Sequence, residues 1–145
     1  MNDNTSSNSN NITVLNLSNK YINEILDLKK FNTSLDFTEL NCSFNKIIQL
    51  DNLPSSLIQL SCSSNQIIQL DNLPSSLVQL DCSSNKIIQL DNLPSSLVQL
   101  YCFDNKIIQL DNLPSSLDTL NCSKNKIIKP HNLHKKYPNI QKLNV

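Results

Sequence analysis

Five cysteines spaced 20 residues apart are the first side chains in this sequence to consider for chemistry: Cys42, Cys62, Cys82, Cys102 and Cys122. Thiolates hold zinc or form disulfides, but zinc sites use close pairs such as C-x-x-C or a nearby histidine partner, and these cysteines have neither. Leu17 occupies the corresponding position in an earlier stretch, which indicates a buried apolar site. We therefore predict a structural column of buried thiols that pack as small apolar groups.

Disulfides and metal ligation are the alternatives. Cysteines on adjacent strands would lie about 5 Å apart, close enough for a bond. Their number is odd, however, and the first residues show no secretory signal, so we expect reduced thiols in an intracellular, cytoplasmic setting. His131 and His134 form H-N-L-H, which is weak evidence for metal without further ligands. We expect no metal site.

Catalysis also lacks a suitable set of residues. Paired serines such as Ser75 and Ser76 lie in repeated turn segments, with no histidine and carboxylate arranged around them. A glycine-rich phosphate loop is excluded, because the chain contains no glycine. We predict a protein with no catalytic residues and no cofactor, and therefore not an enzyme.

Charge and composition argue against nucleic acid and membrane as partners. The 145 residues carry 12 basic and 12 acidic side chains, and every basic one is lysine. No basic stripe is visible, and no apolar run approaches the roughly 18 residues of a membrane span. Another protein is the expected partner.

An internal repeat positions all these residues. The block IIQLDNLPSSL begins at Ile47, Ile67, Ile87 and Ile107, giving a period of 20 residues. The segment Leu60–Cys62 alternates in and out like a short strand, and the remainder of each unit must return the chain within about 14 residues. Prolines such as Pro54 favour an extended return over a helix. Stacked units then bury one continuous core.

The pattern LxxLxCxxNxI followed by LxxLPxxL resembles the leucine-rich-repeat signature, in the short 20-residue subtype of bacterial effector proteins. It is also similar to leucine-rich-repeat proteins of giant amoebal viruses. The resemblance implies a right-handed curved solenoid, α/β by convention but β-rich, with a parallel sheet on the concave face and extended or 3₁₀ segments on the convex face. It covers residues 11–145, with units starting near residues 12, 37, 57, 77, 97 and 117 and a partial unit at 140.

The ends depart from the pattern. Residues 1–10 are uniformly polar, and we expect a disordered tail there. The first unit has Lys20 where the others have asparagine, and the unit that begins at Leu117 is 23 residues long. No C-terminal cap is recognisable at Val145, so self-association through uncapped ends is an alternative to a monomer.

The signature asparagines should form a structural column that satisfies backbone groups after each strand: Asn45, Asn65, Asn85, Asn105 and Asn125. A second set, Asn52, Asn72, Asn92 and Asn112, should form surface turns. N-x-S triplets such as Asn121-Cys122-Ser123 are expected by chance in a chain so rich in asparagine.

Exposed strand positions are where a partner would bind. The unit that begins at Leu97 groups Tyr101, Phe103 and Asp104, where its neighbours carry serine or aspartate. Aromatic side chains beside a charge are typical interface anchors, although drift between duplicated units is the alternative. Our candidate partner-binding residues on the concave face are Phe44, Gln79, Asp81, Gln99, Tyr101, Phe103, Asp104, Asn121 and Lys124.

One more row is apolar. Ile48, Ile68, Ile88 and Ile108 follow the core isoleucines. They form either a semi-exposed stripe or, as we favour because an exposed row would threaten solubility, a partly buried part of the wall. For the whole chain the leading hypothesis is a viral or pathogen protein that binds a host factor. The alternatives are an adaptor of a ubiquitin-ligase system and a near-inert structural repeat protein.

Overall fold

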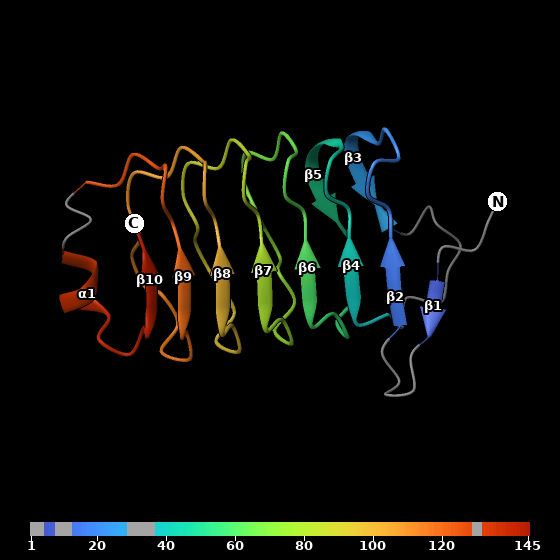
Figure 1. The fold of residues 1–145 in the computed structure, drawn as a ribbon. Helices are drawn as coiled ribbons and strands as arrows, with labels where there is room; N and C mark the ends of the chain where they lie inside the picture. Colours follow the sequence, from blue (N-terminus) through green and yellow to red (C-terminus); the bar gives the residue numbers. More distant parts are fainter. Residues whose placement is uncertain (1–4, 8–12, 29–36, 129–131) are drawn as a thin grey trace.

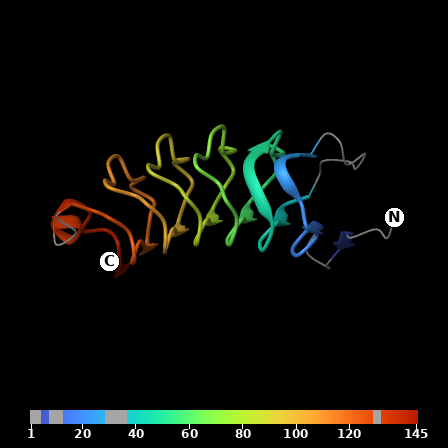
Figure 2. The ribbon, with the colours of Figure 1, turned by 90° about the horizontal axis from the view of Figure 1, so that it is seen from above.

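The computed structural model describes residues 5–7, 13–28, 37–128 and 132–145. These residues form a solenoid of about six stacked coils, and the row of coils bends gently toward the side that carries the main sheet (Figures 1 and 2). The prediction of a leucine-rich-repeat solenoid with a parallel sheet is confirmed. Of the predicted N-terminal tail, residues 1–10, the structure describes Thr5–Ser7, which form β1. The rest of the tail lies outside the described residues.

The main sheet has eight strands in the order β1-β2-β4-β6-β7-β8-β9-β10. Their bounds are β1 Thr5–Ser7, β2 Thr13–Asn16, β4 Glu39–Asn41, β6 Gln59–Ser61, β7 Gln79–Asp81, β8 Gln99–Tyr101, β9 Thr119–Asn121 and β10 Lys142–Asn144. All pairs are parallel except β1 with β2. Short strands are enough because each coil contributes one strand to the sheet. Each strand residue pairs with the equivalent residue of the next repeat unit.

Side chains stack by unit because the period is constant. Leu60 pairs in register with Leu40 and Leu80, and all three point inward. The residues equivalent to Leu57, Cys62 and Ile67 in the other coils form three more such columns, and nearly all of them are fully buried. Each coil alone has no interior, so this burial is the main source of stability and comes from contacts between neighbouring coils.

The return segments on the far side are mostly extended, as the prolines predict. Two details were not predicted. In the first coils, β3 (Asn23–Asp27) and β5 (Lys46–Asp51) pair as a separate parallel sheet, and in the last coil a short helix, α1 (Leu133–Lys136), takes the place of the extended segment. Figure 1 shows β3 and β5 at the N-terminal end of the row of coils and α1 beside β10 at the C-terminal end.

A column of serines joins neighbouring coils at the turns that precede the strands of the main sheet. The hydroxyl oxygen of Ser76 lies 2.7 and 2.6 Å from the carbonyl oxygens of Ser55 and Leu57, and Ser96 and Ser116 repeat the contact one coil further on. In the last coil the side-chain amide of Asn139 makes the equivalent two bonds. The paired serines of the repeat are therefore engaged in joining coils.

Candidate functional site on the main sheet

The outward side chains of the main sheet and of the turn after each strand form a continuous surface, which we call the sheet face. In the coil of β8 it comprises Gln99, Tyr101, Phe103 and Asp104, and the other coils contribute the equivalent positions. Leu100 and Cys102 point inward between them. Strand alternation therefore sets which side chains a partner can reach.

An aromatic cluster occupies this face at β8. The side chains of Tyr101 and Phe103 are partly exposed, and the Tyr101 hydroxyl donates to Gln99 Oε1 at 3.2 Å. Lys124, one coil on, places its Nζ 4.9 Å from the centre of the Phe103 ring. Asp104 is exposed and accepts a bond from the Ser84 hydroxyl at 3.3 Å. The cluster therefore spans three consecutive coils and combines two rings with one charge of each sign.

The other candidates surround this cluster to different extents. Gln79, Asp81 and Asn121 lie on the strands on either side of β8 and are partly buried. Phe44 is 61% exposed, but its coil is that of β4, with β6 and β7 between it and β8. The structure therefore brings together all the candidates except Phe44.

A structural role for part of this face was missed from the sequence. Asn41, Asp81 and Asn121 each accept, through Oδ1, the backbone N–H of the serine two residues later, at 3.0 to 3.3 Å. Asn16 does the same with Ser18. These are Asx turns, and they shape the chain as it leaves each strand. The spacing Asn/Asp-x-Ser is the signal that could have revealed them.

Two coils lack the Asx turn: Ser61 and Tyr101 stand where the others have asparagine or aspartate. At Tyr101 a side chain that would shape the turn is replaced by a ring that faces outward. Sites that break a local structural rule are often functional, since their gain lies elsewhere.

The residue before each signature asparagine adopts a left-handed backbone conformation: φ is 58° at Phe44, 54° at Ser64, 52° at Ser84, 54° at Asp104 and 53° at Lys124. Glycine would fit most easily, but the chain has none. The conformation turns these side chains to the rim of the sheet face. Phe44 is the least suited to it, because a bulky side chain is rare at positive φ.

The signature asparagines hold this turn in place. Asn85 Oδ1 accepts the N–H of Ile67 in the preceding coil at 2.9 Å. Its Nδ2 lies 3.0 to 3.1 Å from the carbonyl oxygens of Cys62, Cys82 and Ser83. The same pattern recurs at Asn65, Asn105 and Asn125. Each asparagine thus serves its own coil and the one before it.

The first unit illustrates this dependence on the next coil. Asn45 Oδ1 accepts the N–H groups of Lys20 and Ile22, both at 3.0 Å. Lys20 needs no asparagine in its own place to complete that turn, because Asn45 supplies the acceptor from the following coil. The surface asparagines Asn52, Asn72, Asn92 and Asn112 form a separate column with φ of 52° to 55°.

All five cysteines are free and buried. Burial raises the pKa of Cys42 from its ordinary value of 9.0 to about 12 and that of Cys122 to about 11. The pKa values of Cys62, Cys82 and Cys102 also rise, again mainly through burial. A thiol with a raised pKa carries little thiolate at neutral pH, so these groups are poor nucleophiles and poor metal ligands.

The described ranges hold neither a metal-binding cluster nor a membrane-spanning helix. There, no group of three or more His, Cys, Asp or Glu side chains is placed to hold a metal ion. His134 is exposed, whereas His131 lies outside the described residues. No helix in the described part of the chain is long and apolar enough to cross a membrane.

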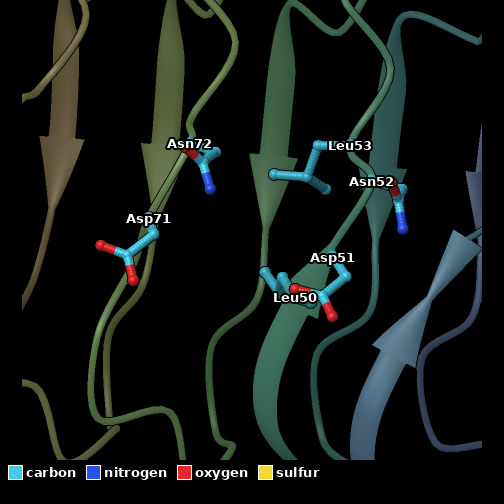
Figure 3. A pocket seen from close by; sticks show the side chains of 6 residues that line it. All are labelled: Leu50, Asp51, Asn52, Leu53, Asp71 and Asn72. Carbon is cyan, nitrogen blue, oxygen red and sulfur yellow. The ribbon is translucent and has the colours of Figure 1, made fainter.

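A depression of about 460 Å³ lies on the return segments, away from the sheet face (Figure 3). It is lined by Leu50, Asp51, Asn52, Leu53, Asp71 and Asn72. Gln49 and Gln69 donate to its two carboxylates at 2.8 and 2.6 Å. The two aspartates of the depression therefore already accept hydrogen bonds. The residues that line it include no serine, cysteine, lysine or histidine that could act as a nucleophile.

The fold defines a leucine-rich-repeat solenoid of the kind found in bacterial effectors. YopM from Yersinia enterocolitica matches with a TM-score of 0.71 and 29% sequence identity, over 93% of this chain and 33% of that one. A Shigella effector leucine-rich-repeat domain matches with a TM-score of 0.71 and 32% identity, over 80% of this chain and 51% of that one. The chain thus spans about a third of the first structure and about half of the second. No protein-family model matches it, and no curated protein sequence does.

Proposed function

We propose that this chain binds a partner protein through the sheet face, centred on Tyr101, Phe103 and Asp104. The supporting observation is the aromatic cluster itself, which replaces an Asx turn and two serines with two rings and a carboxylate. Aromatic side chains dominate the binding energy of many interfaces, because they bury large areas with few rotatable bonds. The effector repeats that share this fold support a role in protein interaction.

The surroundings of the cluster suit such an anchor. Gln99 holds the Tyr101 hydroxyl and Lys124 lies against the Phe103 ring, so both rings are constrained before a partner arrives. Side chains that are already ordered lose less entropy on binding. Asp104 and Lys124 are exposed at the rim, where charge contributes to orientation and association rate more than to affinity.

We further propose that the partner is a host-cell factor and that the protein acts inside the cell. The Shigella neighbour is an effector, which supports a pathogen protein acting on a host. Five free, buried thiols are compatible with a reducing compartment. The proposed mechanism is binding by shape and contact, without turnover.

The test is a set of three parallel pull-downs from lysate of a candidate host cell, read by quantitative mass spectrometry. The baits are the unmodified chain, Tyr101→Ser with Phe103→Ser, and a control with Ile68→Ser and Ile88→Ser, which removes two apolar side chains from another surface. Circular dichroism and thermal unfolding verify that all three are folded. We expect a partner that the first and third baits retain and the second loses.

Two results would contradict the proposal. Equal recovery of that partner by the first two baits would place binding outside the aromatic cluster. Failure of the unmodified chain to capture any saturable partner from several lysates would favour the near-inert structural repeat instead.

A further inference from the structure

A row of five isoleucines runs along the return side of the solenoid, one in each coil from the second to the sixth. We call it the isoleucine stripe: Ile48, Ile68, Ile88, Ile108 and Ile128. The first four are 42 to 54% exposed and Ile128 is 72% exposed. Of the two alternatives, the row is the semi-exposed stripe and not the partly buried part of the wall that we favoured. The reason is local: Ile47 and Leu50 point inward, which leaves Ile48 and Gln49 on the outside.

Columns of opposite charge lie on the two sides of the stripe. Two residues before each isoleucine is a lysine, except for glutamine in one coil: Lys46, Gln66, Lys86, Lys106 and Lys126. Three residues after each of the first four isoleucines is an aspartate: Asp51, Asp71, Asp91 and Asp111. Within the described ranges no lysine of the first column forms an ion pair with an aspartate of the second. These charges are therefore not paired across the stripe within one molecule.

The chain itself shows that the aspartate column can bind a lysine from another segment. At the C-terminal end of the stripe, α1 buries Leu133, and Lys136 forms an ion pair with Asp111. A hollow of about 280 Å³ between α1 and the coils is lined by Ile108, Ile128, Leu133 and neighbouring residues. Leu133 belongs to the buried core, and Ile108 and Ile128 stay exposed, so α1 does not cover the stripe. Its Lys136 does show that an aspartate of the second column can pair with a lysine from another segment.

We infer that the isoleucine stripe is the contact surface for a second copy of this chain, with the two solenoids parallel. A two-fold axis along the row of coils turns one surface onto the other and exchanges the two sides, so each lysine column faces the partner's aspartate column. Because both copies have the same spacing between coils, every rung meets its equivalent in register. In the reversed orientation lysines would face lysines, which is unfavourable.

A matched pair of double variants tests whether the stripe mediates association. Ile68→Ser with Ile88→Ser removes two isoleucines of the stripe, whereas Ile58→Ser with Val78→Ser removes two exposed apolar side chains that immediately precede β6 and β7 in the same coils. Sedimentation equilibrium of the full chain should show a monomer–dimer equilibrium. The stripe variant should raise the dissociation constant at least ~100-fold, since each substitution acts twice in a symmetric dimer, and the control should raise it less than ~3-fold.

A monomeric unmodified chain across the accessible concentration range would overturn the inference. So would equal weakening by the two variants, because the effect would then not be specific to the stripe. Thermal unfolding of each variant separates loss of association from loss of folding.

The parallel orientation has its own test. Ile68→Cys should be joined to a second Ile68→Cys chain by a short thiol-reactive linker, while the buried native cysteines leave the unmodified chain unlinked. Lys86→Asp and Asp91→Lys should each weaken the dimer by ~3- to 10-fold, and the double exchange should restore it. Linking of Ile68→Cys only to Ile108→Cys, with no restoration by the double exchange, would establish the reversed orientation and overturn the parallel one.

Discussion

The sheet face and the isoleucine stripe belong to the same coils, yet they differ in how they change along the solenoid. At the position of Tyr101, the successive coils from β4 to β9 carry Asn41, Ser61, Asp81, Tyr101 and Asn121. The stripe has isoleucine in every coil from the second to the sixth. A surface that changes at each step can distinguish one partner from another, whereas a surface that repeats matches a partner with the same repeat.

Two adjacent coils make the contrast sharpest. Residues 77–96 and 97–116 differ at three positions only, where Asp81, Ser83 and Ser84 are replaced by Tyr101, Phe103 and Asp104. All three positions lie on the sheet face. Substitutions without selection would be expected on every exposed surface, including the return segments. Their confinement to one surface favours recognition at the sheet face over drift.

The largest expected effect concerns the interior that both surfaces share. Asn85 holds the Ile67 N–H, beside the stripe, and the Ser83 carbonyl, at the sheet face. Asn85→Ala leaves several buried backbone groups without partners and should lower the free energy of unfolding by about 3 to 4 kcal/mol. Asn105→Ala should cost about the same, because its bonds are equivalent. Chemical denaturation measures both, and unequal losses would show that the two coil interiors differ.

The second-largest expected effect comes from replacing the sheet-face residues of one coil by those of the preceding coil. Tyr101→Asp, Phe103→Ser and Asp104→Ser together convert the coil of β8 into a copy of the preceding one. We expect partner affinity to fall about 100-fold, or about 3 kcal/mol, while stability changes by less than about 1 kcal/mol. Isothermal titration calorimetry with the captured partner gives the first quantity. An unchanged affinity would mean that the stripe or another surface binds that partner.

Alkaline pH should lower the free energy of unfolding by a smaller amount for each buried thiol in the interior beneath both surfaces. The unfolded chain releases thiol protons above its ordinary pKa of 9.0, whereas burial keeps the folded thiols protonated, up to a pKa of about 11 for Cys122 and about 12 for Cys42. Stability is therefore complete below pH 9 and falls as the pH rises, by about 1 kcal/mol per thiol between pH 9 and 10. Cys82→Ala should lose correspondingly less over the same interval, measured by urea denaturation. Identical losses in both proteins would contradict burial as the cause.

The sequence predicted the columns well, because a constant period carries each residue into register with its equivalent in the next coil. It failed where no repeat constrains the chain. The pairing of β3 with β5 and the helix α1 lie in the irregular first and last units. The exposure of the stripe was missed because it depends on the backbone path from Ile47 to Leu50, which an in-out pattern of apolar residues does not define.

The sheet face could be anticipated in part. Alternation along a strand identified Tyr101 and Phe103 as outward-facing, and both are partly exposed. The contacts among these residues could not be read from spacing: Lys124 comes from the next coil, and the asparagine or aspartate at the position of Tyr101 acts within a turn. Phe44 is also an outward-facing candidate, but two strands separate its coil from β8, and residue type alone does not show that distance.

The smallest effect gives the most specific test of the difference between the two surfaces. Tyr101→Asn restores the residue type that accepts a backbone N–H in the coils of β4 and β9, here that of Phe103. One added hydrogen bond should stabilise the fold by about 0.5 kcal/mol, net of the lost contact between Tyr101 and Gln99. Partner binding should weaken at the same time. Ser61→Asn is the control in the other coil that lacks the turn, and it should stabilise the fold similarly without changing binding. Stability and affinity that fall together at Tyr101 would show that its ring supports the fold, and would remove the reason for placing the partner site there.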